Sequence, residues 1–149
     1  MSVQSTYSDT LDAAVVGQRA NQEPARLISR NVEDAAGIAF GLAVSQGTAD
    51  RGAKAFGTGD TAILGISTRE RSTDAAAPDV FAENSSALVM TSGCIWVTAS
   101  VAVNAGDPVY VIPATGAFAK TSVGSAVLIV GARWDTSTIG AALAVVRLA

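Results

Sequence analysis

The chain contains no histidine among its 149 residues and only one cysteine, Cys94. Histidine is the commonest general base and metal ligand near neutral pH, so a Ser-His-Asp triad and a histidine-based metal centre are excluded. A single cysteine cannot form an internal disulfide, so the fold does not depend on an oxidising compartment. Most side chains that build catalytic and metal sites are therefore missing, and we predict a protein that is not an enzyme and uses no metal and no cofactor.

Charge is also scarce, because charged residues make up 15% of the chain and the net charge is -3. Nucleic-acid binding requires clustered Lys and Arg, and here they are scattered, so we expect no nucleic-acid partner. Lys54 and Lys120 are the only lysines, and both lie in turn-rich surroundings that disfavour a Ser-Lys nucleophile. Glu33 and Asp34 point to different sides of an extended chain and cannot share a proton, so we assign them to a solvated edge.

Long apolar runs are missing as well. Residues 84–106 carry no charge, yet Ser, Thr, Gly and Asn interrupt them throughout. A membrane helix needs about 20 apolar residues, so this stretch is better explained as paired strands, and we expect no membrane partner. Residues 1–11 lack the basic and apolar regions of a signal peptide, which favours synthesis in the cytosol.

The residues that are abundant are small and apolar. Apolar residues reach 49% and mean hydropathy is +0.36, whereas aromatics are only 5%. A chain of this length fits one domain and buries roughly 70% of its unfolded surface. We place a single β domain at residues 25–149, preceded by a polar extended N-terminal arm at residues 1–24; the alternative for residues 1–24 is a disordered terminus. Within the arm, Val15 and Val16 form an apolar patch that is expected to dock.

From residue 37 onward, short apolar runs alternate with turn signals at a spacing typical of a barrel or sandwich. The predicted strands are 37–44, 62–67, 87–90, 94–99, 108–112, 127–134 and 143–148, and a turn at residues 91–93 is predicted to separate the third strand from the fourth. No helix-like segment completes about three turns before a Gly or Pro. The fold is therefore predicted to be all-β, a small β-barrel or jelly-roll-like sandwich. Residues 68–80 are expected to form a long exposed loop.

Three local motifs are better explained by structure than by chemistry. Residues 57–60 lack the Gly-Lys-Ser/Thr of a phosphate loop and are predicted to form a tight turn. Asp107 has no Asp-rich run around it for calcium, so its carboxylate is expected to bond local amides. Cys94 lies among apolar neighbours and is assigned to the core. Trp96 and Trp134 could each anchor the core or an interface.

Seven short segments, taken in order, resemble the tailed-bacteriophage capsid cement, or decoration, proteins. These segments are 38–44, 63–67, 93–97, 105–111, 116–118, 131–134 and 142–148. The likeness extends from about Arg26 to the end of the chain. It implies a structural virion protein, made in the host cytoplasm, that binds the major capsid protein on the outer capsid surface and cements neighbouring capsomers, often as a symmetric homo-oligomer.

A dimer is favoured over a trimer, because a dimer that bridges two capsomers makes its second contact intramolecularly. The arm and the loop at 68–80 are the expected contact regions with the capsid or within the oligomer. The residues predicted to make these contacts are Tyr7, Leu11, Val15, Val16, Arg69 and Arg71.

The alternative is a non-catalytic β-sandwich module that binds a small ligand or a glycan. Such a module presents exposed aromatic side chains on one face. The Trp and Tyr residues of this chain are dispersed along the sequence, which disfavours a surface for stacking sugars.

Overall fold

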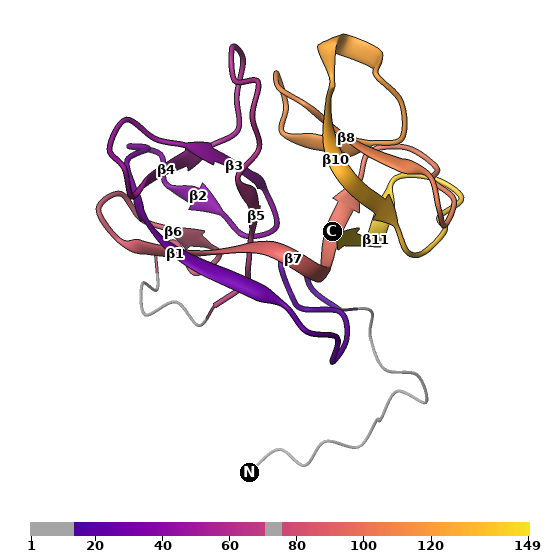
Figure 1. Ribbon diagram of the computed structural model, residues 1–149, viewed down its shortest axis with the longest axis horizontal. Coiled ribbons are helices and arrows are strands. Elements are labelled where there is room, and N and C mark those ends of the chain that lie inside the picture. The colour runs from indigo at the N-terminus through magenta and orange to yellow at the C-terminus, as the bar shows by residue number, and fades with distance from the viewer. Residues whose placement is uncertain (1–13, 71–75) are drawn as a thin grey trace.

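The computed structural model describes residues 14–70 and 76–149 and consists of β-strands joined by turns and loops (Figure 1). The strands are β1 Arg26–Val32, β2 Ile38–Ala39, β3 Ala43–Gln46, β4 Gly52–Ala55, β5 Gly65–Ser67, β6 Val80–Phe81, β7 Ser86–Ala99, β8 Pro108–Ile112, β9 Ala117–Ala119, β10 Val127–Trp134 and β11 Ala142–Leu148. A 3-10 turn, Val123–Ser125, precedes β10. Within the described ranges, no helix has the length and apolarity needed to cross a membrane.

The strands close into two small barrels that share β7. The first barrel runs β1-β4-β3-β5-β7 and closes where β7 pairs with β1. The second runs β7-β11-β10-β8-β9 and closes where β9 pairs with β7. Figure 1 shows them as two lobes, purple to magenta and orange to yellow, joined by β7. The all-β barrel fold predicted from the sequence is confirmed, and the chain forms two such barrels.

The shared strand β7 overturns the prediction of two strands separated by a turn at residues 91–93. Ser86 to Ser92 pair with β1, and Gly93 to Ala99 pair with β11. Gly93 has φ +122°, and a Cβ there would lie 2.8 Å from the Cβ of Ala25. Glycine therefore bends the strand from one barrel into the other without ending it.

Other sequence predictions are met in part. The predicted strands at 108–112 and 127–134 match β8 and β10. The predicted strand at 37–44 is wrong, because the chain turns at Gly41, with φ +72°, and forms β2 and β3 instead. The pattern missed β1, β4, β6 and β9.

Two hydrophobic clusters fill the molecule. The smaller one lies in the first barrel and includes Phe40 and Phe81, whose rings meet edge to face with centroids 4.9 Å apart. The larger one fills the second barrel around Trp134 and continues into the first through Ile66 and Met90. The larger cluster contains residues of both barrels, and that residues 25–149 form one domain stays a prediction.

The predictions for the turn at residues 57–60 and for Asp107 are confirmed. The Asp60 amide donates to the Gly57 carbonyl at 3.1 Å, and the Gly57 amide donates to Asp60 Oδ2 at 3.0 Å. The Lys54 ammonium lies 2.8 Å from the same carboxylate. Asp107 Oδ2 accepts the Asn104 amide at 2.9 Å. These carboxylates stabilise turns and are not grouped for catalysis.

Glu33 is partly exposed and has a structural role beyond that of a solvated edge residue. Its carboxylate accepts the amides of Thr48 at 2.6 Å and Ala49 at 2.9 Å. It lies against Gly47 and Gly52, where a Cβ would collide with it. These amide bonds lower the pKa of Glu33 below its ordinary value of 4.5, Ala49 contributing most. Through these hydrogen bonds Glu33 stabilises the turn between β3 and β4.

Candidate functional site

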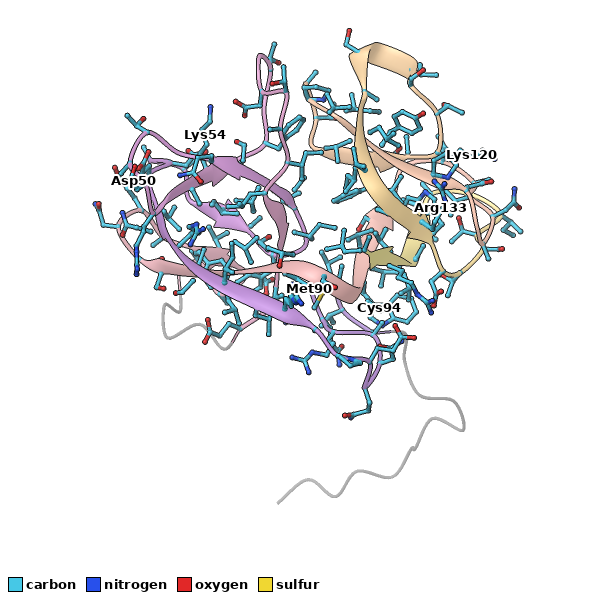
Figure 2. The ribbon with its side chains drawn as sticks, in the orientation of Figure 1. Asp50, Lys54, Met90, Cys94, Lys120 and Arg133 are labelled. Atoms are coloured by element: carbon cyan, nitrogen blue, oxygen red, sulfur yellow. The ribbon has the colours of Figure 1, made fainter. Side chains whose placement is uncertain are left out.

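Charged side chains do not gather into a chemical centre in the described part of the chain. Residues 14–70 and 76–149 contain no group of three or more Cys, Asp or Glu placed to hold a metal ion. Figure 2 shows Asp50 and Lys54 at the outer end of the first barrel and Lys120 and Arg133 on the second, with the apolar junction at Met90 between them. The candidate site is therefore a contact surface.

Residues 14–20, here called the strap, lie along β7 where the two barrels meet. The Gly17 amide donates to the Trp96 carbonyl at 2.8 Å, and the Trp96 amide donates to the Gln18 carbonyl at 2.9 Å. The Ala20 amide donates to the Cys94 carbonyl at 2.9 Å. β1 pairs with the first half of β7, and the strap pairs with the second half along the same edge.

Arg69 joins the strap to the loop that follows β5. Its amide donates to the Gly17 carbonyl at 2.6 Å. Its guanidinium lies 2.6 Å from the Asp79 carboxylate and 5.4 Å from the centroid of the Phe40 ring. The ion pair links the two ends of the 68–80 loop, and the arm and loop predicted as contact regions come together here.

The two valines of the strap lie differently. Val16 packs against Gly41, beside a hollow of about 140 Å³ that Leu42 and Phe118 also line. Val15 is 46% exposed. The strap surface, comprising Val15, Val16 and Arg69, therefore includes an exposed apolar side chain, a hollow and a guanidinium. Such a mixture suits protein contact, in which an apolar centre is bordered by polar groups.

Cys94 and the two tryptophans take structural positions. The Cys94 thiol is buried, and its Sγ lies 3.3 Å from Glu23 Oε2. Burial, followed by this contact, raises the pKa of the Cys94 thiol, which opposes thiolate formation and confirms its assignment to the core. Trp134 is 1% exposed and belongs to the core. Trp96 is half-buried, and its backbone holds the strap.

The described residues cover three of the six predicted contact residues. Val15, Val16 and Arg69 are described, whereas Tyr7, Leu11 and Arg71 lie outside the described residues. Their role in contact stays a prediction for all six.

The sequence reasoning missed two outward-facing side chains of β10, Leu128 at 41% exposure and Val130 at 86%. The available signal was the run of four apolar residues at 127–130. Because successive side chains of a strand point to opposite faces, two of the four had to face outward in a barrel wall.

Two closed barrels that share one strand, with exposed apolar and basic side chains on their surface, are typical of a structural protein. Residues 3–149 match the sequence model of the phage family described as structural cement protein (E217 gp24/Pam3 gp6). The chain belongs to this family, and its role is that of a structural cement protein. The resemblance seen in the short sequence segments is confirmed.

The fold is also found in a phage particle. The chain is similar to one from the structure described as the capsid of Myoviridae phage XM1, with a TM-score of 0.78 and 20% identity over 99% of this chain and 98% of that one. None of the curated protein sequences matches it. At this identity the likeness establishes the fold. The family does not favour the ligand- or glycan-binding alternative.

Proposed function

We propose that the protein binds the major capsid protein of a tailed phage on the outer surface of the capsid and cements neighbouring capsomers without catalysis. The observation that supports this most is the meeting of the strap and Arg69 at one place. It gives a cement protein a compact contact surface on which apolar and charged groups are already ordered. The protein is made in the host cytoplasm and functions in the virion.

Cementing requires no bond chemistry. A protein that binds the assembled shell better than free subunits adds its binding free energy to the assembled state. A homo-oligomer, with a dimer favoured, gains further because its second contact becomes intramolecular. The proposed contact residues are Tyr7, Leu11, Val15, Val16, Arg69 and Arg71.

The test measures binding of the purified protein to phage capsids from which this protein is missing. Val15→Asp and Arg69→Glu alter the strap surface, and Arg133→Glu is the matched control because Arg133 is exposed on the second barrel. We expect each strap variant to bind at least about tenfold more weakly, as central interface residues do, and the control to bind as the wild type does. Strap variants that bind fully would remove this surface from the proposal.

A second measurement tests the role itself. Quantitative mass spectrometry of purified virions gives the ratio of this chain to the major capsid protein. A near-integral ratio is expected of a protein that repeats with the shell. Only a few copies per virion, or none, would overturn the lattice-wide role.

A further inference from the structure

A groove of about 360 Å³ lies between the two barrels, beside β7. Figure 1 shows the two lobes that form its walls. The groove is lined by residues 61–65 of the first barrel, Thr91 of β7, residues 128–130 of β10, and Leu148 and Ala149 at the end of β11. No residue of the strap is among those that line it, so the groove and the strap surface use different residues.

The strand β10 is bulged where it borders the groove. Its register with β8 shifts between Leu128 and Arg133. Within this stretch Gly131 has φ +80°, and a Cβ there would lie 2.8 Å from the Cβ of Ala149. A bulge re-aims the side chains next to it, and Val130 is 86% exposed. The backbone therefore holds a branched apolar side chain in water at the rim of the groove.

The other wall of the groove is apolar and well packed. Ile63 and Leu64 are half-buried, Ile63 against the larger hydrophobic cluster and Leu64 against the smaller one. The Leu64 amide donates to the Val44 carbonyl at 2.7 Å, which holds this wall against β3. Apolar side chains thus line both walls, and an exposed apolar surface of this kind marks a site of contact.

The charge of the groove indicates which partner it suits. None of the described residues that line it is charged. Asp60, which precedes the first lining residue, is neutralised by the Lys54 ammonium at 2.8 Å. Two copies of a chain with a net charge of -3 repel each other, so they meet most favourably where each presents an uncharged apolar surface. Homodimer interfaces are accordingly more apolar than other protein surfaces and depleted in charge at their core.

The shape of the groove also favours a second copy as its occupant. In a two-fold dimer the same surface serves both partners, so a projecting side chain must lie beside a hollow that can receive its equivalent. Val130 projects at the rim, and the groove that it borders is lined by Ile63 and Leu64. A two-fold rotation about an axis at this rim places Val130 of each copy in the groove of the other. A partner of another kind would need only the hollow.

We propose that this groove forms the interface of a symmetric dimer of the chain, in which Val130 of each copy packs against Ile63 and Leu64 of the other. Leu128, which is 41% exposed in the same wall as Val130, is covered as well. The inference deepens the proposed function, because it rests on the homo-oligomer proposed there and names the surface that forms it. The strap residues take no part in this interface.

Disulfide capture between two differently labelled chains tests the contact directly. All chains carry Cys94→Ala, which removes the native thiol. A light chain with Val130→Cys is mixed with a ¹⁵N-labelled chain carrying Ile63→Cys, and in the matched control the labelled chain carries Ile139→Cys, which is fully exposed and outside the groove. We expect at least about tenfold more light–heavy disulfide with Ile63→Cys, because a disulfide forms only where the Cα atoms come within about 7 Å. Equal yields with the two labelled chains would overturn the inference.

Analytical ultracentrifugation without cross-linking provides an independent readout. The wild type should sediment as a dimer. Val130→Glu brings a charge into the interface, and we expect it to associate at least about tenfold more weakly. Val130 is largely exposed within one chain, so this variant is expected to fold as the wild type does. Ile139→Glu is the matched control and should associate as the wild type does.

Three sedimentation results would overturn the inference. A wild type that stays monomeric has no such interface. A Val130→Glu variant that associates as tightly as the wild type would place the interface elsewhere. A ring or chain of more than two copies would mean that the contact is head-to-tail and not reciprocal.

The capsid-binding assay separates this inference from the proposed role on the capsid. If the dimer forms and the disulfide is captured but the protein does not bind capsids, the capsid role fails and the dimer interface stands. If the wild type is a monomer that still binds capsids, the dimer interface fails and the capsid role stands.

Discussion

Val16 occupies the space that a side chain on Gly41 would fill. Gly41 has φ +72°, and its amide donates to the Ser67 carbonyl at 2.8 Å. The glycine therefore has two roles, because it turns the chain between β2 and β3 and lets the strap approach the first barrel. The position of the strap depends on a residue that is distant in sequence.

Gly41→Ala should destabilise the protein by about 2 kcal/mol or more, because the new Cβ adds strain at positive φ and collides with Val16. The measurement is the free energy of unfolding in urea. Gly59→Ala is the matched control, since Gly59 has φ +92° but no atom within 4 Å of its built Cβ. It should cost only the backbone strain, about 1–2 kcal/mol. If Gly41→Ala and Gly59→Ala lower the free energy of unfolding equally, the contact with Val16 contributes nothing.

Cys94 should react slowly with a thiol reagent in the native protein, because its thiol is buried and its pKa is raised. At mildly alkaline pH we expect labelling at least about 100-fold slower than in urea, since the thiolate is the reacting form. Deleting residues 1–20 removes the strap and should accelerate native labelling, whereas deleting residues 1–12 leaves the strap in place and should not. Equal rates in the two deletions would contradict a covering role for the strap.

Glu33 should make the free energy of unfolding depend on pH in the acidic range. The amides of Ala49 and Thr48 lower the pKa of Glu33 in the folded state. The contribution of this carboxylate to the free energy of unfolding is therefore fully present above the unfolded pKa, near 4.5. It is lost as the pH falls through the lower folded pKa. We expect Glu33→Gln to destabilise the protein near neutral pH and the difference from wild type to shrink below about pH 4.

Urea denaturation across this pH range provides the measurement for Glu33. Glu83→Gln, at an exposed position, is the control and should keep the acid dependence of the wild type. A Glu33→Gln difference that stays constant with pH would disprove the role of the carboxylate charge.

Met90→Ala should destabilise both barrels together. Met90 is fully buried at the junction and belongs to the cluster that crosses it, and removing such a side chain costs about 2–5 kcal/mol. Hydrogen exchange followed by mass spectrometry should show protection falling in β3 and β5 and also in β10 and β11. Val101→Ala, at a position 43% exposed, should change protection little. Loss confined to the first barrel would mean that the barrels are independent.

The sequence predicted those strands whose apolar runs end at turn residues. Residues 108–112 and 127–134 are such runs, and they form β8 and β10. β1 and β4 were missed because their sequences, RLISRNV and GAKA, have little local strand signal. These two strands pair with each other, and β1 also pairs with the distant strand β7, so their environment decides their conformation.

The turn predicted at 91–93 failed for a related reason. Thr, Ser and Gly in succession are a local turn signal. In the fold, Ser92 pairs with Arg26 and Gly93 pairs with Leu148, so partners on both sides keep the strand extended. Only the three-dimensional arrangement shows that one strand serves two barrels.

The contact surface was predictable in composition but not in geometry. Val15 and Val16 are apolar residues in a polar segment, which indicated docking. That they would meet Arg69 follows from the pairing of residues 17–20 with β7, a contact across more than fifty residues. The exposure of Leu128 and Val130 was not predicted, because a run of apolar residues in a strand does not reveal which face is left uncovered.

The strand β7 gives the molecule a mechanical property. A force that pulls one barrel away from the other runs along a single covalent backbone through Gly93 and is shared by the ladders on either side of it. Ladders loaded along the strand direction must break many hydrogen bonds at once instead of opening one after another. The protein can thus act as a tether under tension, and its resistance is set by the length of β7 in each barrel.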